Sequence, residues 1–245
     1  MFRYDITFCG NKKCKKYDCR RHHKNTPVDI PYSMAFFNEE NKRKCDNYLN
    51  GDKKQIKGIM IDFDNTAYNT SKAIVNLYHD DYCEYSDYKY VDWRDIKTWE
   101  FSELELASED VINAYFNQQR FFRTIEPMKN FEIVAWLLRK DYKLTFCSHG
   151  YSPNLRQKQK FIARNYPNDD FIGVNLKTHK DKSCVDMSDC IFIDDTAKNL
   201  ESSNAAIKIL FGPDFEFNKE WDGIRCHTWD EVLFEIRRLE ENGVI

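Results

Sequence analysis

Short apolar runs alternate with amphipathic stretches from residue 58 to the end of the chain. The apolar runs predict buried strands, which we place at residues 58–61, 143–147, 190–193 and 207–211, whereas the run at 171–174 is short and ambiguous. Apolar residues three and four positions apart predict helices between them, at about 71–78, 111–116, 131–139, 199–206 and 228–239. Strands that alternate with helices are typical of an α/β fold, so we expect a Rossmann-like parallel sheet covered by helices.

The segment between the first two strands is too long for an ordinary loop. We predict that residues 68 to 125 form a mostly helical cap, with a capping box from Ser102 to Glu105. Its aromatic residues Trp93, Trp99 and Phe101 could stack on a flat substrate group, or they could pack the small core of the cap itself.

The first 52 residues differ in character from the rest, and we place a domain boundary there, with a second domain from 53 to 245. Four cysteines, Cys9, Cys14, Cys19 and Cys45, stand among many lysines and arginines. They could hold a structural Zn²⁺ in a segment too short to bury a core, or they could be reduced and unliganded. The basic residues could touch phosphate backbones or could form a solvated loop.

Composition bears on only a few broad classes of function. A net charge of −3 indicates no general affinity for nucleic acid. No apolar run reaches the roughly 18 residues of a membrane helix, and the first ten residues lack the apolar region of a signal peptide. We therefore expect a cytoplasmic protein without a membrane partner, in which most cysteines are reduced or bound to metal.

Polar residues follow three of the predicted strands. Asp62 and Asp64 follow the first, Ser148 ends the second, and Asp194 and Asp195 end the run at 190–193. The carboxyl ends of parallel strands lie at one edge of the sheet, so these groups can meet. A cluster of carboxylates suits a hard cation such as Mg²⁺.

Two further features suit an anionic ligand at this edge. Ser148, with His149 beside it, is a candidate for contact with phosphate oxygens. A cation is needed to balance the substrate and the carboxylates, and either Lys182 or Lys180 could supply it.

The order of these residues resembles the motifs of the haloacid dehalogenase superfamily of phosphohydrolases. Residues 62–66 resemble its D-x-D-x-T motif, Ser148 its second motif, Lys182 its third, and Asp194 with Asp195 its fourth. The cap position, together with residues 181–183 and 95–99, is similar to the 5′(3′)-deoxyribonucleotidase group. Asn65 departs from that group, which commonly has glycine there, and the N-terminal cysteine segment has no counterpart in it.

The resemblance implies a role for each matching residue. Asp62 would attack phosphorus to form an aspartyl-phosphate, and Asp64 would serve as general acid and then as general base. Thr66 and Ser148 would hold phosphoryl oxygens, and Lys182 would neutralise charge. Mg²⁺ would be held by Asp62, by the backbone carbonyl of Asp64, and by one or both of Asp194 and Asp195.

We therefore expect a Mg²⁺-dependent phosphomonoester hydrolase that acts on nucleoside monophosphates. One alternative is a phosphatase for another small metabolite or for a nucleic-acid end, which the basic N-terminal residues would favour. Another alternative is a non-catalytic binding protein on the same scaffold.

Overall fold

The computed structural model describes residues 8–9, 34–35, 55–213 and 218–245. The chain divides into two compact units, one formed by residues 56–233 and the other by residues 1–55 with 234–245. The second unit contains the short parallel strands β1 (Phe8–Cys9) and β2 (Met34–Ala35). The predicted zinc ligands Cys14, Cys19 and Cys45, and the side chain of Cys9, lie outside the described residues.

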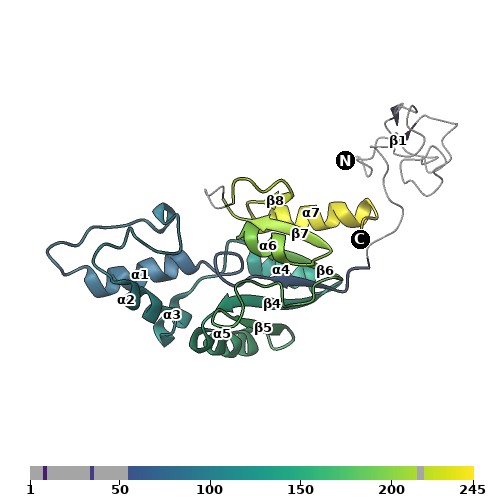
Figure 1. Cartoon of the computed structure of the whole chain (residues 1–245). Coiled ribbons are helices and arrows are strands. Elements are labelled where there is room, and N and C mark those ends of the chain that lie inside the picture. The colour runs from purple at the N-terminus through teal and green to yellow at the C-terminus, as the bar shows by residue number, and fades with distance from the viewer. Residues whose placement is uncertain (1–7, 10–33, 36–54, 214–217) are drawn as a thin grey trace. The chain divides into compact units, whose positions relative to one another are not determined.

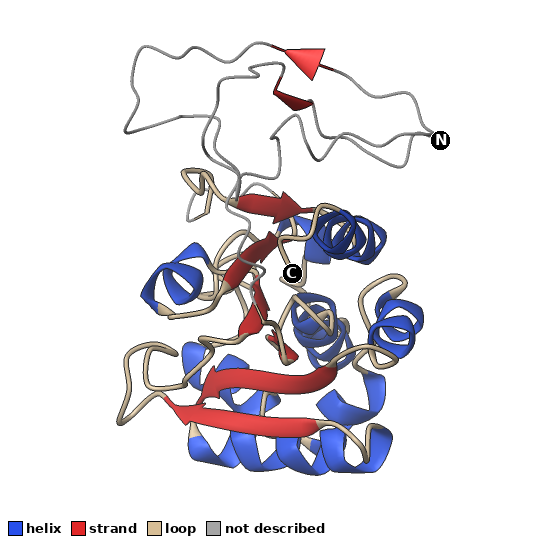
Figure 2. Ribbon diagram, turned by 90° about the vertical axis from the view of Figure 1, so that its right-hand side faces the viewer, coloured by secondary structure: helices blue, strands red, loops and turns tan. Residues whose placement is uncertain are grey.

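A six-stranded parallel sheet organises the unit formed by residues 56–233 (Figures 1 and 2). Its spatial order is β5-β4-β3-β6-β7-β8. The strands are β3 (Gly58–Ile61), β4 (Lys143–Gly150), β5 (Asp170–Asn175), β6 (Cys190–Asp194), β7 (Ile207–Phe211) and β8 (Ile224–Cys226). The central strands β3 and β6 are buried along their whole length, which explains their unbroken apolar sequences.

Helices lie on both faces of the sheet, as Figure 2 shows. Among them are α4 (Phe131–Leu138), α5 (Ser152–Asn165) and α6 (Ala197–Ser202). The last helix, α7 (Trp229–Glu241), begins in this unit. Helix α5 packs on β4 and β5, and α6 packs on β6 and β7. The parallel, helix-covered sheet confirms the predicted fold class.

The cap extends from the sheet on the side of the β3 carboxyl end (Figure 1). It contains α1 (Thr70–Tyr82), the 3₁₀ turn η2 (Trp93–Asp95), α2 (Glu109–Tyr115) and α3 (Gln119–Thr124). The segment that enters the cap and the segment that leaves it are hydrogen-bonded to each other. Asn69 N–H donates to Glu126 O at 2.9 Å, and Met128 N–H donates to Ala67 O at 2.8 Å.

Several predicted boundaries were wrong. No helix begins at the Ser102–Glu105 pattern; α2 begins at Glu109, where the Ser108 hydroxyl accepts from Val111 N–H. Helix α6 lies a few residues earlier than predicted, and α3, α5 and β8 were not predicted. Within the described residues, no helix is long and apolar enough to cross a bilayer.

Candidate active site

Strand β3 lies where the connections of the sheet change direction. The chain proceeds from β3 to β4 and β5 on one side, and later to β6, β7 and β8 on the other. Ligands of open α/β sheets bind at the carboxyl ends of strands at such a switch point. Asp62 follows β3 directly, and its N–H donates to Ile193 O of β6 at 2.9 Å. The structure thus places the first candidate carboxylate at this switch point.

One buried ion cluster joins the ends of β3 and β6. The ammonium of Lys182 donates to Asp62 Oδ1 and, at 2.6 Å, to Asp194 Oδ2. Lys182 and Asp194 are both 0% exposed, and Asp62 is 5% exposed. Lys180, the alternative lysine, is exposed. The lysine in contact with the predicted nucleophile is therefore Lys182.

Burial changes the protonation of this cluster. It raises the pKa of Asp62 to about 7, because the Lys182 ammonium only partly offsets the loss of water and the nearby Asp194 and Asp64 carboxylates oppose ionisation. The pKa of Asp195 is raised as well, mainly by burial and then by Asp194. Burial alone would lower the pKa of Lys182, but Asp194 and Asp62 raise it above its ordinary value. The cluster therefore favours any additional cation.

A second buried cluster surrounds Asp64. Its Oδ1 accepts from the Thr70 hydroxyl at 2.8 Å, and its Oδ2 lies 3.4 Å from Ser148 Oγ. The ammonium of Lys158, on α5, also contacts Asp64 Oδ2 and donates to Ser148 Oγ at 2.9 Å. Side chains from α1, β4 and α5 thus converge on one carboxylate.

The adjacent Asp194 and Asp195 have different surroundings. Besides Lys182, Asp194 accepts from Thr196 N–H at 2.8 Å and from the Asn199 side chain at 3.1 and 3.2 Å. Asp195 accepts from the Thr196 hydroxyl at 3.2 Å and lines a pocket. Asp194 is therefore occupied by protein donors, whereas Asp195 has fewer of them and lines the pocket.

The loop after β3 has a buried hydroxyl without a partner. Thr66 is 0% exposed, and no hydrogen bond of its Oγ1 is found within the described residues. The backbone carbonyl of Thr66 accepts from the buried Trp229 indole at 2.9 Å, which holds the loop in place. A buried polar atom without a partner is uncommon, and a ligand or water oxygen would satisfy it.

Asn65 explains the departure from glycine noted above. Its φ is 50°, in the left-handed region that glycine and asparagine tolerate best. Its side chain donates to the Ser71 hydroxyl and accepts from Ser71 N–H, both at 3.0 Å. Asparagine therefore keeps the turn that glycine would allow and also ties the loop to the first turn of α1.

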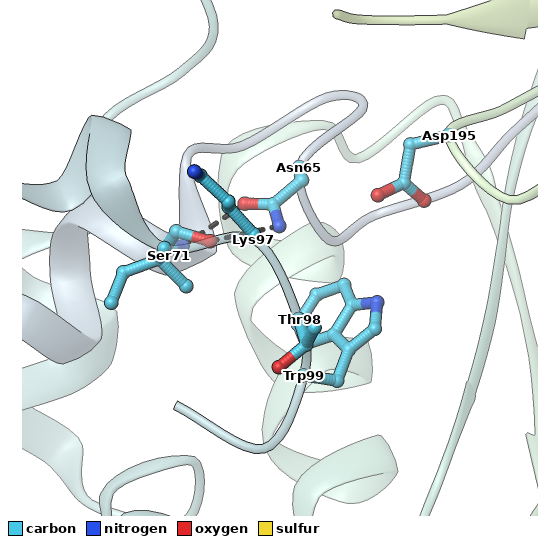
Figure 3. Close-up of a pocket in the computed structure, with 7 residues that line it drawn as sticks. Asn65, Ser71, Lys97, Thr98, Trp99 and Asp195 are labelled. Atoms are coloured by element: carbon cyan, nitrogen blue, oxygen red, sulfur yellow. Dashed lines mark hydrogen bonds between the residues drawn. The ribbon is translucent and has the colours of Figure 1, made fainter. Parts of the chain in front are cut away.

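A pocket lies between this loop and the cap (Figure 3). It is lined by Asn65, Ser71, Ile96, Lys97, Thr98, Trp99 and Asp195. Of the three aromatic residues singled out in the sequence, only Trp99 lines it. Phe101 is 2% exposed and packs beside Phe116 inside the cap, and Trp93 lies under the Arg94 guanidinium.

His149, a candidate for phosphate contact, has a different partner in this structure. Its Nε2 lies 2.8 Å from the backbone oxygen of His179. The side chain therefore ties the end of β4 to the loop that follows β5.

The candidate metal ligands do not form a complete coordination site by themselves. Within the described part of the chain, no group of three or more His, Cys, Asp or Glu side chains is arranged to hold an ion. Their chemistry nevertheless fits a divalent cation. The site contains two buried ammonium groups, those of Lys158 and Lys182. When all four carboxylates are ionised, the net charge of the site is −2; these carboxylates are Asp62, Asp64, Asp194 and Asp195. Mg²⁺ commonly needs only one or two carboxylates, with water and phosphate as its other ligands.

Sequence reasoning missed the two residues that hold Asp64, Thr70 and Lys158. Thr70 is the first residue of α1. Hydroxyl residues are common near the start of a helix, so its type did not indicate a role in the site. Lys158 lies on the unpredicted helix α5. Its position three residues after Leu155 and four before Ile162 is the only signal that could have placed it on the buried face.

The whole sheet and cap match one family model. The model described as 5′ nucleotidase, deoxy (Pyrimidine), cytosolic type C protein covers residues 54–239, well over half of the chain. The chain belongs to this nucleotidase family. It is accordingly a phosphoric monoester hydrolase, as the sequence motifs predicted.

Solved structures support the fold of this nucleotidase family member. A haloacid dehalogenase-like family hydrolase from Streptococcus pneumoniae is 19% identical, with a TM-score of 0.50 over 74% of this chain and 99% of that chain. A HAD-superfamily hydrolase of subfamily IA from Geobacter sulfurreducens PCA is 10% identical, with a TM-score of 0.50 over 77% and 100%. No curated protein matches the chain significantly.

Proposed function

We propose that this hydrolase is a Mg²⁺-dependent 5′-nucleotidase that acts through an aspartyl-phosphate on Asp62. The observation that carries the proposal is the buried contact of Lys182 with both Asp62 and Asp194 at the sheet's switch point. The ammonium holds the Asp62 carboxylate in one orientation and balances its charge, as a nucleophile that meets an anionic phosphate requires.

The reaction divides between the two aspartates of the loop after β3. An oxygen of Asp62 forms a bond to phosphorus while the bond from phosphorus to the ester oxygen breaks, and Asp64 gives its proton to the departing alkoxide. A water molecule then attacks phosphorus, Asp64 accepts a proton from it, and the Asp62–phosphate bond breaks. Inorganic phosphate and the free enzyme result, so each group returns to its starting state.

The side chains around the two aspartates suit the phosphoryl group. The Ser148 hydroxyl and the unpartnered Thr66 hydroxyl are candidate donors to its oxygens. Asp62, Asp195 and the backbone carbonyl of Asp64 would hold Mg²⁺, which stabilises charge on the phosphoryl oxygens when bound. We choose Asp195 over Asp194 because Asp194 is already occupied by Lys182, Thr196 and Asn199.

A nucleotide suits the cap side of the pocket. Trp99 is 42% exposed and lines the pocket together with Asp195 (Figure 3). In the proposed complex its indole stacks on a base while the phosphate meets Asp62. The family match favours a deoxynucleotide. We propose a cytoplasmic location because the matched family is described as cytosolic.

A substrate panel tests the proposal. Phosphate release is measured with ribo- and deoxyribonucleoside monophosphates, sugar phosphates and 5′-phosphorylated oligonucleotides, each with Mg²⁺ and with a chelator. We expect the highest kcat/KM for a nucleoside monophosphate, only with Mg²⁺, and a loss on the order of 10⁴-fold or more in Asp62→Asn. Preference for a sugar phosphate or an oligonucleotide end, or wild-type activity of Asp62→Asn, would contradict it.

A further inference from the structure

A buried lysine outside the four motifs lies against the active site. Lys158 is 1% exposed, although it belongs to a helix whose other charged residues face solvent. It lies on the same face of the helix as the buried Leu155 and Ile162. An apolar side chain at this position would need no charged partner, whereas a lysine does. A buried ammonium is rare unless it is paired, so its partners are informative.

The partners of Lys158 belong to the reaction site. Its ammonium contacts Asp64 Oδ2 and Ser148 Oγ, and it lies 5.0 Å from the centre of the Phe63 ring. Within the described residues, Asp64 is the one carboxylate that it contacts. The lysine therefore joins α5 to the loop after β3 and to the end of β4.

These contacts fix the orientation of both neighbours. Asp64 accepts from Thr70 on one oxygen and from Lys158 on the other, so its carboxylate is held from two sides. An ammonium can only donate, so Ser148 Oγ is the acceptor in its contact with Lys158. The Ser148 proton is then directed elsewhere, and its 3.4 Å separation from Asp64 is long for a hydrogen bond between two oxygens.

We infer that Lys158 is a positioning residue for the hydrolysis, which holds the Asp64 carboxylate beside the leaving oxygen and turns the Ser148 hydroxyl into a donor for the phosphoryl group. Lys182 serves Asp62 and Lys158 serves Asp64, so each aspartate of the loop has its own buried ammonium. The inference rests on the proposed function, because it assumes that Asp64 assists the leaving group.

Leaving-group dependence separates this role from simple packing. A nucleoside 5′-phosphate expels an alkoxide, which needs an acid, whereas p-nitrophenyl phosphate expels a stable phenolate and needs little help. Because general acid–base assistance is typically worth about 10²–10⁴-fold, we expect Lys158→Met to lower kcat about 100-fold for the nucleotide. For p-nitrophenyl phosphate we expect a decrease of less than about 10-fold by the same reasoning. The matched control is Lys160→Met, an exposed lysine on the same helix, which should change neither.

Lys158→Met leaves the buried Asp64 without its ammonium partner, and the variant could fail to fold for that reason. A double variant keeps the test possible. Asp64→Asn with Lys158→Met buries no unpaired charge, and circular dichroism checks its fold. If Lys158 acts mainly through Asp64, the double variant has p-nitrophenyl phosphate activity within about 10-fold of Asp64→Asn, since only the orientation of Ser148 is lost in addition.

Three outcomes would overturn the inference: an equal decrease for both substrates, a Lys158→Met variant that matches Lys160→Met, or a double variant at least 10-fold below Asp64→Asn. Failure of the proposed function is recognised separately in the wild-type protein, which would then prefer a sugar phosphate or an oligonucleotide end to a nucleoside monophosphate.

Discussion

The sheet edge and the cap hold the side chains of the candidate site in different ways. At the sheet edge, Asp62 and Asp64 are buried, and both are fixed by an ammonium and by neighbouring strands or helices. On the cap, Lys97, Thr98 and Trp99 line a pocket that Asn65 and Asp195 of the sheet edge also line, and these three cap residues remain exposed. Groups that react must be held in place, whereas groups that recognise a substrate can adapt. The sheet edge should therefore control the rate of the reaction, and the cap should control which substrate binds.

The largest expected effect comes from the sheet edge. Lys182→Met leaves Asp62 and Asp194 without their common cation, and breaking a buried pair costs about 3–5 kcal/mol. We expect Tm to fall by about 10 °C, since 1 kcal/mol corresponds to about 2–4 °C at this size. We also expect kcat to fall about 10³-fold or more. Differential scanning calorimetry and steady-state kinetics measure the two effects.

Lys180→Met is the matched control, since Lys180 is exposed two residues away. It should leave Tm and kcat unchanged. If the Lys180 variant loses activity and the Lys182 variant keeps it, the assignment of Lys182 to the site is wrong.

The cap variant should have a smaller effect of a different kind. Trp99→Ala removes a stacking surface worth about 0.5–1.5 kcal/mol, so we expect KM for a nucleotide to rise about 3- to 10-fold. kcat should stay within about twofold, because the truncated group touches no reacting atom. Trp93→Ala is the control, as Trp93 does not line the pocket. A decrease in kcat without a change in KM would break the proposed division between sheet edge and cap.

The buried charge of Asp62 should make the metal-free protein less stable as pH rises. Its pKa in the folded state is about 7, against 3.8 as the ordinary value, so the folded state binds more protons between these two pH values. Stability therefore falls as pH rises through this window. Asp62→Asn should raise the Tm of the metal-free protein by a few degrees at pH 8, about 2–4 °C for each 1 kcal/mol.

That gain should shrink toward pH 5, where the wild-type carboxyl is protonated. Mg²⁺ should stabilise the wild-type protein more than the variant at pH 8. Thermal unfolding at several pH values, with and without Mg²⁺, measures both effects. An Asp62→Asn variant that is less stable than the wild type at pH 8 would show that burial of this charge carries no cost.

An effect on stability, smaller than that of Lys182→Met, is expected where the sheet edge meets the cap. Asn65→Ala loses two hydrogen bonds to Ser71 and places alanine at φ 50°, which should cost about 1–2 kcal/mol. Asn65→Gly keeps the backbone conformation, so it should cost less than about 1 kcal/mol. Urea unfolding of both variants measures the difference, and equal stability of the two would contradict the role of the left-handed turn.

The strands of the sheet could be predicted because burial on both faces gives uninterrupted apolar runs. Runs such as 58–61 and 190–193 were placed to within one residue, and the parallel order brings Asp62 and Asp194 to one edge. The site residues that follow strands could therefore be found without a structure. Ser102–Glu105 shows the limit of local patterns, because a capping box also occurs where turns follow one another.

Helix α5 could not be recognised from the sequence because polar residues with partners elsewhere in the fold interrupt its apolar periodicity. A lysine and an asparagine, Lys158 and Asn154, occupy positions on its buried face, so the apolar period is incomplete. Their partners lie far away in the sequence: Lys158 contacts Asp64, 94 residues earlier. Long-range pairs of this kind follow from the assembled sheet and from no local property of the segment. A polar residue at a core position of a weak helix is therefore a useful sign of a site.

The most direct test of the account is to trap the covalent intermediate. The enzyme is mixed with a nucleoside 5′-monophosphate and Mg²⁺ and quenched in acid within the first turnover, and its peptides are analysed by mass spectrometry. We predict one phosphoryl group on the peptide that contains Asp62, and none in Asp62→Asn. Rapid nucleotide hydrolysis with the phosphoryl group on another residue, or an equal burst in Asp62→Asn, would contradict the central claim.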